Sequence, residues 1–178
     1  MKRCLNTLAA SLLMISLSTS AQGLSSPITP ANQSGKWEQI SEFTHIDKGH
    51  TQRQRDSIDE LARRFLGSQL RGDKDNDLRV LQRLLDRGIV ANDDTAKLQA
   101  MGVVLGDVIA QELGLTWVIY EDEEGRNRAL RYKQHKDVLF PVTMISRRAE
   151  TGADVDIMAI YEKAVQRYKP LLPALPYS

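Results

Sequence analysis

Residues 105–121 read LGDVIAQELGLTWVIYE, and this stretch joins a helix to a strand. Before Gly114 the apolar residues recur three and four positions apart, which places them on one side of a helix. After Gly114 the apolar run is continuous. Trp117 and Ile119 fall on one face of the predicted strand, and Val118 and Tyr120 fall on the other. A continuous apolar run of this kind is typical of a strand that is covered on both faces. The stretch therefore predicts a helix packed against a sheet.

Two glycines mark the helix, which we expect to begin near Asp94 or Thr95. Gly102 and Gly106 are four residues apart and therefore lie on the same helix face. Each glycine costs roughly 1 kcal/mol of helix propensity relative to alanine. The pair predicts that another element approaches this face closely. A membrane explanation fails because Asp107, Gln111 and Glu112 interrupt the apolar run.

The strand Leu115–Glu121 leads into a hairpin with an acidic tip. Gly125 marks the turn, Arg128–Tyr132 is the predicted return strand, and Asp137–Phe140 is a predicted third strand. The tip has a dense charge pattern, formed by Glu121, Asp122, Glu123, Glu124, Arg126, Arg128 and Arg131. One interpretation is a solvated tip whose strands are joined by cross-strand ion pairs. The other is a protruding recognition element.

The remaining periodic segments predict four further helices. They cover Thr51–Leu70, Leu78–Arg87 with Asp75 or Asp77 as its cap, a helix starting at Pro141, and Ile157–Tyr168 with Asp154 or Asp156 as its cap. The predicted fold is α+β, with about five helices around a small antiparallel sheet of two to three strands. We expect one domain over residues 51–168. A flexible leader over 24–50 precedes it, with Trp37, Ile40 and Phe43 as a short strand-like contact, and an irregular proline-rich tail over 169–178 follows.

The first 23 residues have the layout of a secretory signal peptide. Lys2 and Arg3 precede an apolar run over residues 5–17, and small residues follow up to Ala21 and Gly23. Cleavage after either residue fits. The alternative is a retained membrane anchor, although the run is shorter than the ~20 residues that span a bilayer. We expect a periplasmic protein without stable membrane insertion after cleavage.

Removal of that segment changes the charge and the thiol chemistry. The chain has 24 basic and 23 acidic residues, so residues 24–178 carry 22 and 23. A near-neutral protein has no global electrostatic reason to bind nucleic acid. The single cysteine, Cys4, lies in the signal segment. The mature chain is therefore expected to lack disulfides, thiolate metal ligands and a cysteine nucleophile.

No motif predicts a catalytic centre, a metal site or a cofactor. Gly67-Ser68-Gln69 lacks the second glycine of a nucleophile elbow. The run Asp73–Asp77 resembles the start of a calcium loop, but Leu78 and Leu84 stand where the loop needs glycine and glutamate. His45 and His50 are close in sequence, but His135 is the only other histidine, and zinc needs three or four ligands.

Three blocks together resemble a known bacterial family, domain of unknown function 3806. They are residues 105–118, the charged turn Asp122-Glu123-Glu124-Gly125, and the proline-containing segment Leu139–Arg148. The resemblance covers about Leu78 to Ala164. It implies a compact α+β domain, and it supplies no reaction, ligand or catalytic residue.

We therefore expect an exported, non-catalytic binding or interaction protein whose partner is another envelope protein. The candidate binding residues are Glu121, Asp122, Glu123, Glu124, Arg126, Arg128, Arg147 and Arg148. One version is an inhibitor or immunity-type protein that presents the acidic tip to a basic partner. The alternatives are a cell-envelope hydrolase with dispersed carboxylates and a histidine, and a structural or stress-related envelope protein. A deep pocket that holds His135 or Asp107 beside another titratable group would favour the hydrolase.

Overall fold

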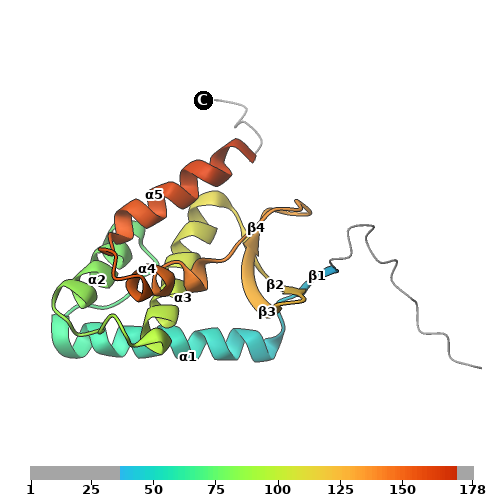
Figure 1. Cartoon of the computed structure of the whole chain (residues 1–178). Helices are drawn as coiled ribbons and strands as arrows, with labels where there is room; N and C mark the ends of the chain where they lie inside the picture. Colours follow the sequence, from blue (N-terminus) through green and yellow to red (C-terminus); the bar gives the residue numbers. More distant parts are fainter. Residues whose placement is uncertain (1–36, 172–178) are drawn as a thin grey trace, which may run out of the picture. The chain divides into compact units, whose positions relative to one another are not determined.

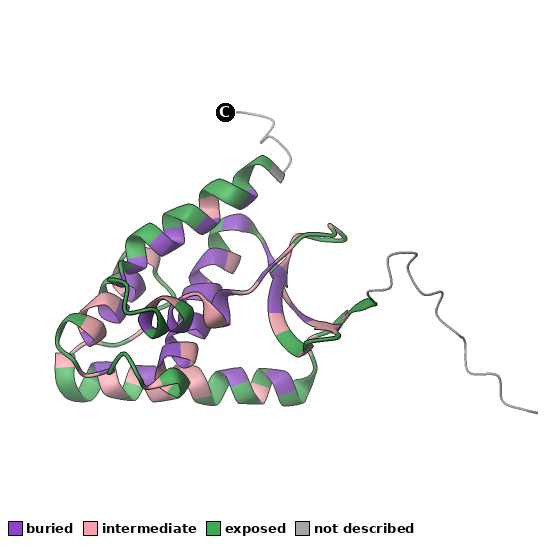
Figure 2. Cartoon of the chain, in the orientation of Figure 1, coloured by how far each residue is buried: buried purple, intermediate pink, exposed green. Residues whose placement is uncertain are grey.

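Helix α3 (Thr95–Leu113) lies at the centre of the fold in the computed structural model, which describes residues 37–171. It contacts α1 (His45–Leu61), α2 (Lys74–Asp86), α4 (Ser146–Glu150) and α5 (Ile157–Tyr168) (Figure 1). Most of α3 is buried, whereas α1 and α5 each expose an outer face (Figure 2). The helix begins at its Asp94 cap and ends at Gly114, where φ is 63°. Both predicted ends are confirmed.

The sheet has four antiparallel strands in the order β1-β2-β3-β4. They are β1 (Glu38–Glu42), β2 (Thr116–Asp122), β3 (Gly125–Arg131) and β4 (Val138–Leu139). Short helical segments complete the described chain: the π-helical η1 (Ala62–Leu66) and the 3-10 turns η2 (Pro141–Thr143) and η3 (Lys169–Leu171). The α+β class with five helices is confirmed, and the sheet has one strand more than predicted.

The additional strand is β1, which lies in the segment that we predicted to be a flexible leader. It pairs with β2 from Glu38 opposite Asp122 to Glu42 opposite Val118. Just after it, Phe43 stacks on Trp117 with the ring centroids 5.9 Å apart. The leader prediction is therefore wrong for residues 38–50. The strand-like contact predicted for Trp37, Ile40 and Phe43 corresponds to β1, although a mostly exposed five-residue edge strand has too little apolar alternation to give its bounds.

Helix α1 begins at His45 and not at the predicted Thr51. The backbone N–H of Asp47 donates to the Thr44 hydroxyl, and the Thr44 N–H donates to the Asp47 carboxylate at 3.0 Å. This reciprocal pair is a capping box, here with aspartate in place of the usual glutamate. The Thr51 hydroxyl is buried inside the helix and donates to the Asp47 and Lys48 carbonyls. The segment with His45 and His50 is therefore helical.

Other helix starts also differ by a few residues from the prediction. Asp73 caps α2 by accepting the Asn76 N–H, whereas Asp77 is buried and accepts the N–H groups of Arg71 and Gly72, each at 2.9 Å. Asp77 thus holds the preceding loop. The segment after Pro141 forms the η2 turn before α4. The bounds of α5 are those predicted, and Asp156 is its cap.

The glycine pair has the role that its spacing predicts. A Cβ on Gly102 would meet the Val142 carbonyl oxygen and would lie 2.7 Å from that of Pro141. A Cβ on Gly106 would lie 2.6 Å from the Trp117 ring and 2.7 Å from the Pro141 ring. The absence of side chains lets η2 and β2 approach α3 at distances that alanine would block.

The predicted signal peptide, residues 24–36 of the leader and residues 172–178 of the tail lie outside the described residues. The first tail residues form η3, so the tail is not irregular from its start. Within residues 37–171, none of the helices combines the length and apolar character that crossing a bilayer requires.

Candidate functional site

The tip of the β2–β3 hairpin is a tight turn at the end of the sheet. Asp122 pairs with Gly125, and Glu123 and Glu124 between them are exposed. The Asp122 carboxylate accepts the backbone N–H of Glu124 at 2.9 Å, which fixes the turn. Gly125 has a φ of 119°, a conformation that side chains disfavour. The two glutamates therefore project from a locally ordered turn.

The arginines of β3 are directed at α1. Arg126 donates to both carboxylate oxygens of Asp47, at 2.8 and 2.9 Å, and Arg128 donates to the Gln54 side chain. Both lie on the same strand face, because they are two residues apart. These contacts join the hairpin to the first turns of the helix. Arg126 and Arg128 were predicted as binding residues, and the structure gives both an intramolecular role.

As a result, the arginines of β3 form no ion pair with the acidic residues at the tip in the described chain. Among residues 37–171, none of Glu121 to Glu124 lies in an ion pair. Glu121 stands opposite Arg126 in the register, but the guanidinium binds Asp47 instead. The tip is solvated, as the first interpretation expects, but the cross-strand ion pairs of that interpretation do not form in the described chain. Asp47 is 5% exposed, so Arg126 satisfies a carboxylate that water reaches poorly.

The pKa values at this junction reflect the same contacts. Burial alone raises the pKa of Asp47, but hydrogen bonds from Thr44 and Arg126 outweigh it, and the pKa lies below its ordinary value. Burial lowers the pKa of Arg128, and the positive charges of Arg126 and Arg55 lower it further against the opposing effect of Asp47. Burial and the charges of Arg128 and Arg53 lower the pKa of His50, which is therefore neutral at pH 7.

Two residues at the start of β1 were not predicted as site residues: Trp37 just before the strand and Glu38 at its first position. Trp37 is 45% exposed, and Glu38 accepts a hydrogen bond from the Tyr120 hydroxyl at 3.2 Å. Together with the tip they line a notch of about 110 Å³, formed by Trp37, Glu38, Tyr120, Asp122, Glu123 and Glu124. Burial raises the pKa of Tyr120, and Glu38, Asp122 and Glu124 raise it further. We call this group of residues the acidic notch.

The other predicted site residues are only partly brought together. Exposed Arg147 on α4 lines a polar groove of about 440 Å³. The other lining residues come from α3, the hairpin, and η2 with the residue before it, namely Gln99, Tyr120, Asp122, Glu124, Arg126, Asn127, Arg128, Phe140, Val142 and Thr143. Arg148 points elsewhere and donates to the Met144 carbonyl at 3.2 Å. Glu121 and Arg148 line neither this groove nor the acidic notch.

A second cavity bears on the hydrolase alternative. Asp107 lines a pocket of about 240 Å³ between α1 and α3, together with Arg55, Asp56, Asp59 and Asp77. Its carboxylates already have partners. Asp107 binds Arg55 and the Trp117 indole, and Asp59 accepts the Leu70 N–H and pairs with Arg63. Asp56 accepts from Gln52, and Asp77 holds the loop described above. Each of these carboxylates therefore has a contact within the fold.

The histidines are not part of that pocket. His135 lies in the loop before β4, 3.6 Å from the Asp137 carboxylate. Within residues 37–171, no group of three or more His, Cys, Asp or Glu side chains is placed to hold a metal ion. The described residues therefore form a charged notch at the surface, and the carboxylates around Asp107 have contacts within the fold.

Comparison with known proteins agrees with the fold. Residues 77–161 match the family model of a domain of unknown function, DUF3806. The chain carries a DUF3806 domain. The matched residues run from the start of α2 into α5 and include the hairpin tip. Trp37, Glu38 and Asp47 lie outside the DUF3806 match, so the acidic notch combines family and non-family residues.

A crystal structure of a protein from Bacteroides thetaiotaomicron has a similar fold. Its TM-score is 0.67 at 15% sequence identity, and the match covers 78% of this chain and 52% of that one. This chain thus spans about half the length of its structural neighbour. At this identity the likeness concerns the fold alone. No curated protein matches the DUF3806 chain described here.

Proposed function

We propose that this DUF3806 protein is an exported, non-catalytic binding protein of the cell envelope, which holds a basic segment of another envelope protein at the acidic notch. One observation carries the proposal: the arginines of the hairpin bind α1, and so the tip carboxylates are left without ion-pair partners in the described chain. A compensated tip would have offered a partner little charge to recognise.

The aromatic residues of the notch support a cationic partner. Trp37 and Tyr120 line the same small volume as four carboxylates, those of Glu38, Asp122, Glu123 and Glu124. Aromatic ring faces attract lysine and arginine side chains, and carboxylates near the rings add Coulomb attraction. Exposed tryptophan is also typical of residues that dominate binding energy at interfaces. A protruding lysine or arginine on the partner fits this combination.

The anchoring of the hairpin gives the notch a fixed shape. Arg126 and Arg128 hold β3 on α1, and Asp122 orders the turn. A preorganised element loses less conformational entropy on binding than a flexible loop. A hydrolase has less support, because the carboxylates around Asp107 are engaged in structural contacts.

The binding test compares two sets of neutral substitutions. Wild-type protein would be used to capture a partner from periplasmic extract, and the purified partner would then be titrated with two variants. The tip variant carries Glu121→Gln, Asp122→Asn, Glu123→Gln and Glu124→Gln. The control removes four exposed charges elsewhere, through Glu42→Gln, Asp93→Asn, Glu150→Gln and Glu162→Gln. We expect the tip variant to lose at least about tenfold in affinity and the control to bind like wild type.

Two further readouts separate this proposal from nonspecific attraction. Affinity for the partner should fall as salt increases, and the salt dependence should weaken in the tip variant. Trp37→Ala should weaken binding without changing the net charge. Equal affinity of wild type and tip variant would contradict the proposal.

Export is tested separately. The supporting feature is the signal-like segment, with Lys2 and Arg3 before an apolar run that ends near Ala21. We expect the protein in the periplasmic fraction with a mature mass that begins at Gln22 or Leu24. A full-length protein in the cytoplasmic fraction would contradict this part of the proposal.

A further inference from the structure

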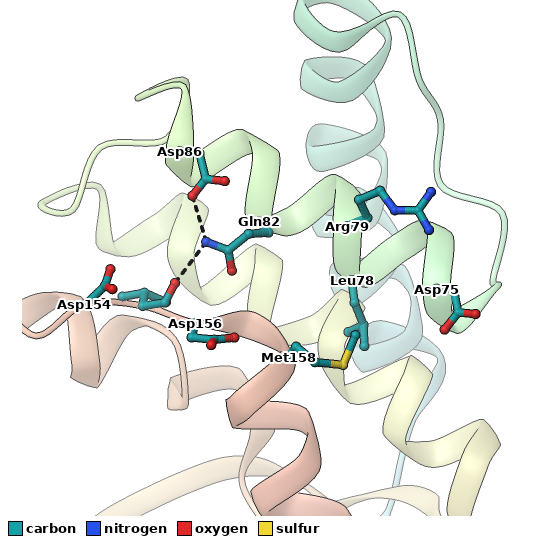
Figure 3. A pocket seen from close by; sticks show the side chains of 9 residues that line it. Asp75, Leu78, Arg79, Gln82, Asp86, Asp154, Asp156 and Met158 are labelled. Carbon is teal, nitrogen blue, oxygen red and sulfur yellow. Dashed lines mark hydrogen bonds between the residues drawn. The ribbon is translucent and has the colours of Figure 1, made fainter.

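A groove of about 600 Å³ lies between α2 and α5 (Figure 3). One wall is a stripe along α2, formed by Asp75, Arg79, Gln82 and Asp86 at helical spacing. The other wall is the segment from Asp154 to Met158 at the start of α5. This groove lies apart from the acidic notch and shares no residue with it.

Gln82 holds the two walls of the groove together. Its side-chain amide donates to the Val155 carbonyl at 3.1 Å and to Asp86 at 2.8 Å, as the dashed lines in Figure 3 show. Its side-chain oxygen accepts the Ile157 N–H at 2.8 Å. One side chain thus fixes the backbone on both sides of Asp156. The groove is therefore formed before anything binds in it.

The chemistry of the groove selects a particular kind of occupant. Leu78 and Val155 form a buried apolar floor, and Met158 is 42% exposed. Around them are four carboxylates, those of Asp75, Asp86, Asp154 and Asp156, against the single guanidinium of Arg79. An occupant that fits has a large apolar side chain beside a positive charge.

Such a pair exists on the surface of the same molecule. Phe65 in η1 is 47% exposed, and the guanidinium of Arg64 stacks over its ring at 5.2 Å from the centroid. The neighbouring Arg63 pairs with Asp59 at 2.7 Å, which leaves Arg64 as the cation beside the ring. Phe65 does not line the groove of its own chain, so a second copy must supply it.

We propose that this protein self-associates by inserting Phe65 and Arg64 of one copy into the α2–α5 groove of another. The phenyl ring covers Leu78 and Met158, and the guanidinium lies among the aspartates. The contact buries two of the large apolar side chains that the described surface exposes. We call the Phe65 and Arg64 side chains the knob. Because the knob and the groove are different surfaces, each copy has one of each, so a closed dimer or a longer chain can form.

The test uses complementary variants of the full chain. The knob variant carries Arg64→Glu and Phe65→Ser, and the groove variant carries Asp154→Arg and Met158→Ser. All four positions are exposed, and circular dichroism checks the fold. Sedimentation would be measured from about 1 µM to about 1 mM, a range that covers weak association. We expect wild type to associate and each variant alone to weaken at least about tenfold.

Mixing the two variants gives the decisive result. The groove of the knob variant and the knob of the groove variant remain intact, so the mixture should form a one-to-one complex and nothing larger. A wild-type monomer throughout the range would overturn the proposal. Weaker self-association in only one of the two variants would also overturn the proposal, as would the absence of a complex in the mixture. The tip variant should associate like wild type, so this inference and the proposed binding function fail independently.

Discussion

The indole N–H of Trp117 donates to the carboxylate of Asp107 at 2.9 Å, which joins the central strand to the central helix. Arg55 of α1 donates to the same carboxylate, at 2.8 Å through one of its amino groups. One side chain thus connects α1, α3 and β2. Trp117 also fills the space that Gly106 leaves open, so the polar and apolar contacts lock the same ring.

Asp107→Ala should lower the free energy of unfolding by about 1–2 kcal/mol, because it removes the partner of a partly buried guanidinium and of an indole N–H. Asp107→Asn should cost less, since the amide oxygen can still accept one of these hydrogen bonds. Urea unfolding gives the stabilities, and the NMR signal of the Trp117 indole N–H reports the local contact. Equal stability of wild type and Asp107→Ala would contradict the connecting role.

Gly102→Ala should destabilise the fold by ~1–3 kcal/mol or more, because the added Cβ meets backbone oxygens that cannot rotate away. Gly106→Leu should have a similar effect through Trp117 and Pro141. The matched control is Gly49→Ala on α1, where the nearest atom to the new Cβ is 3.7 Å away. That change should stabilise by roughly 0.5–1 kcal/mol. Thermal melting of the variants checks the contrast.

Acid should weaken the junction between the hairpin and α1. The pKa of Asp47 lies below its ordinary value of 3.8, so the folded state favours the charged carboxylate. Its stabilising effect is therefore complete above that ordinary value and disappears as the pH falls through the lower folded value. Asp47→Asn should be less stable than wild type at neutral pH, and the difference should shrink below about pH 4. Urea titrations at several pH values test this, and a constant difference would contradict it.

Alkaline pH should lower the free energy of unfolding through the ionisation of Tyr168. This side chain is 1% exposed, its hydroxyl has no hydrogen-bond partner among the described residues, and burial raises its pKa to about 12. The unfolded chain ionises near 10, so stability should fall as the pH rises from about 10 to about 12. Tyr168→Phe should remove this part of the loss. It should also raise stability at neutral pH by up to ~1 kcal/mol, because an unsatisfied group is removed.

The sequence predicted the elements whose apolar periodicity is strong. The α3 helix, its two glycines and the β2–β3 hairpin follow from local spacing, because burial on one face leaves a periodic signal. A strand-like contact was predicted near Ile40, but the bounds of β1 and its partner were not, because its stabilising contacts come from β2, about 80 residues away along the chain. The early start of α1 was missed although Thr44 and Asp47 have the spacing of a capping box, since aspartate replaced the expected glutamate.

Of the candidate site, only the acidic charge could be predicted from the sequence. Four consecutive acidic residues identified the tip, but whether they form ion pairs depends on where Arg126 and Arg128 point. That direction is decided by Asp47 and Gln54, which are more than seventy residues distant. Nothing local in the sequence links these positions. The contribution of Trp37 and Glu38 to the acidic notch likewise depends on the pairing of β1.

The pairing of β1 and the packing of α1 also show that the bounds of the family match differ from the bounds of the packed fold. A chain cut to residues 77–161 would lack the strand that covers one edge of β2 and the helix that packs on α3. It would also lack Arg55 and would end α5 before Tyr168. We therefore expect a fragment that folds alone to include β1 and the whole of α5. The DUF3806 match therefore covers only part of the packed fold that the structure describes.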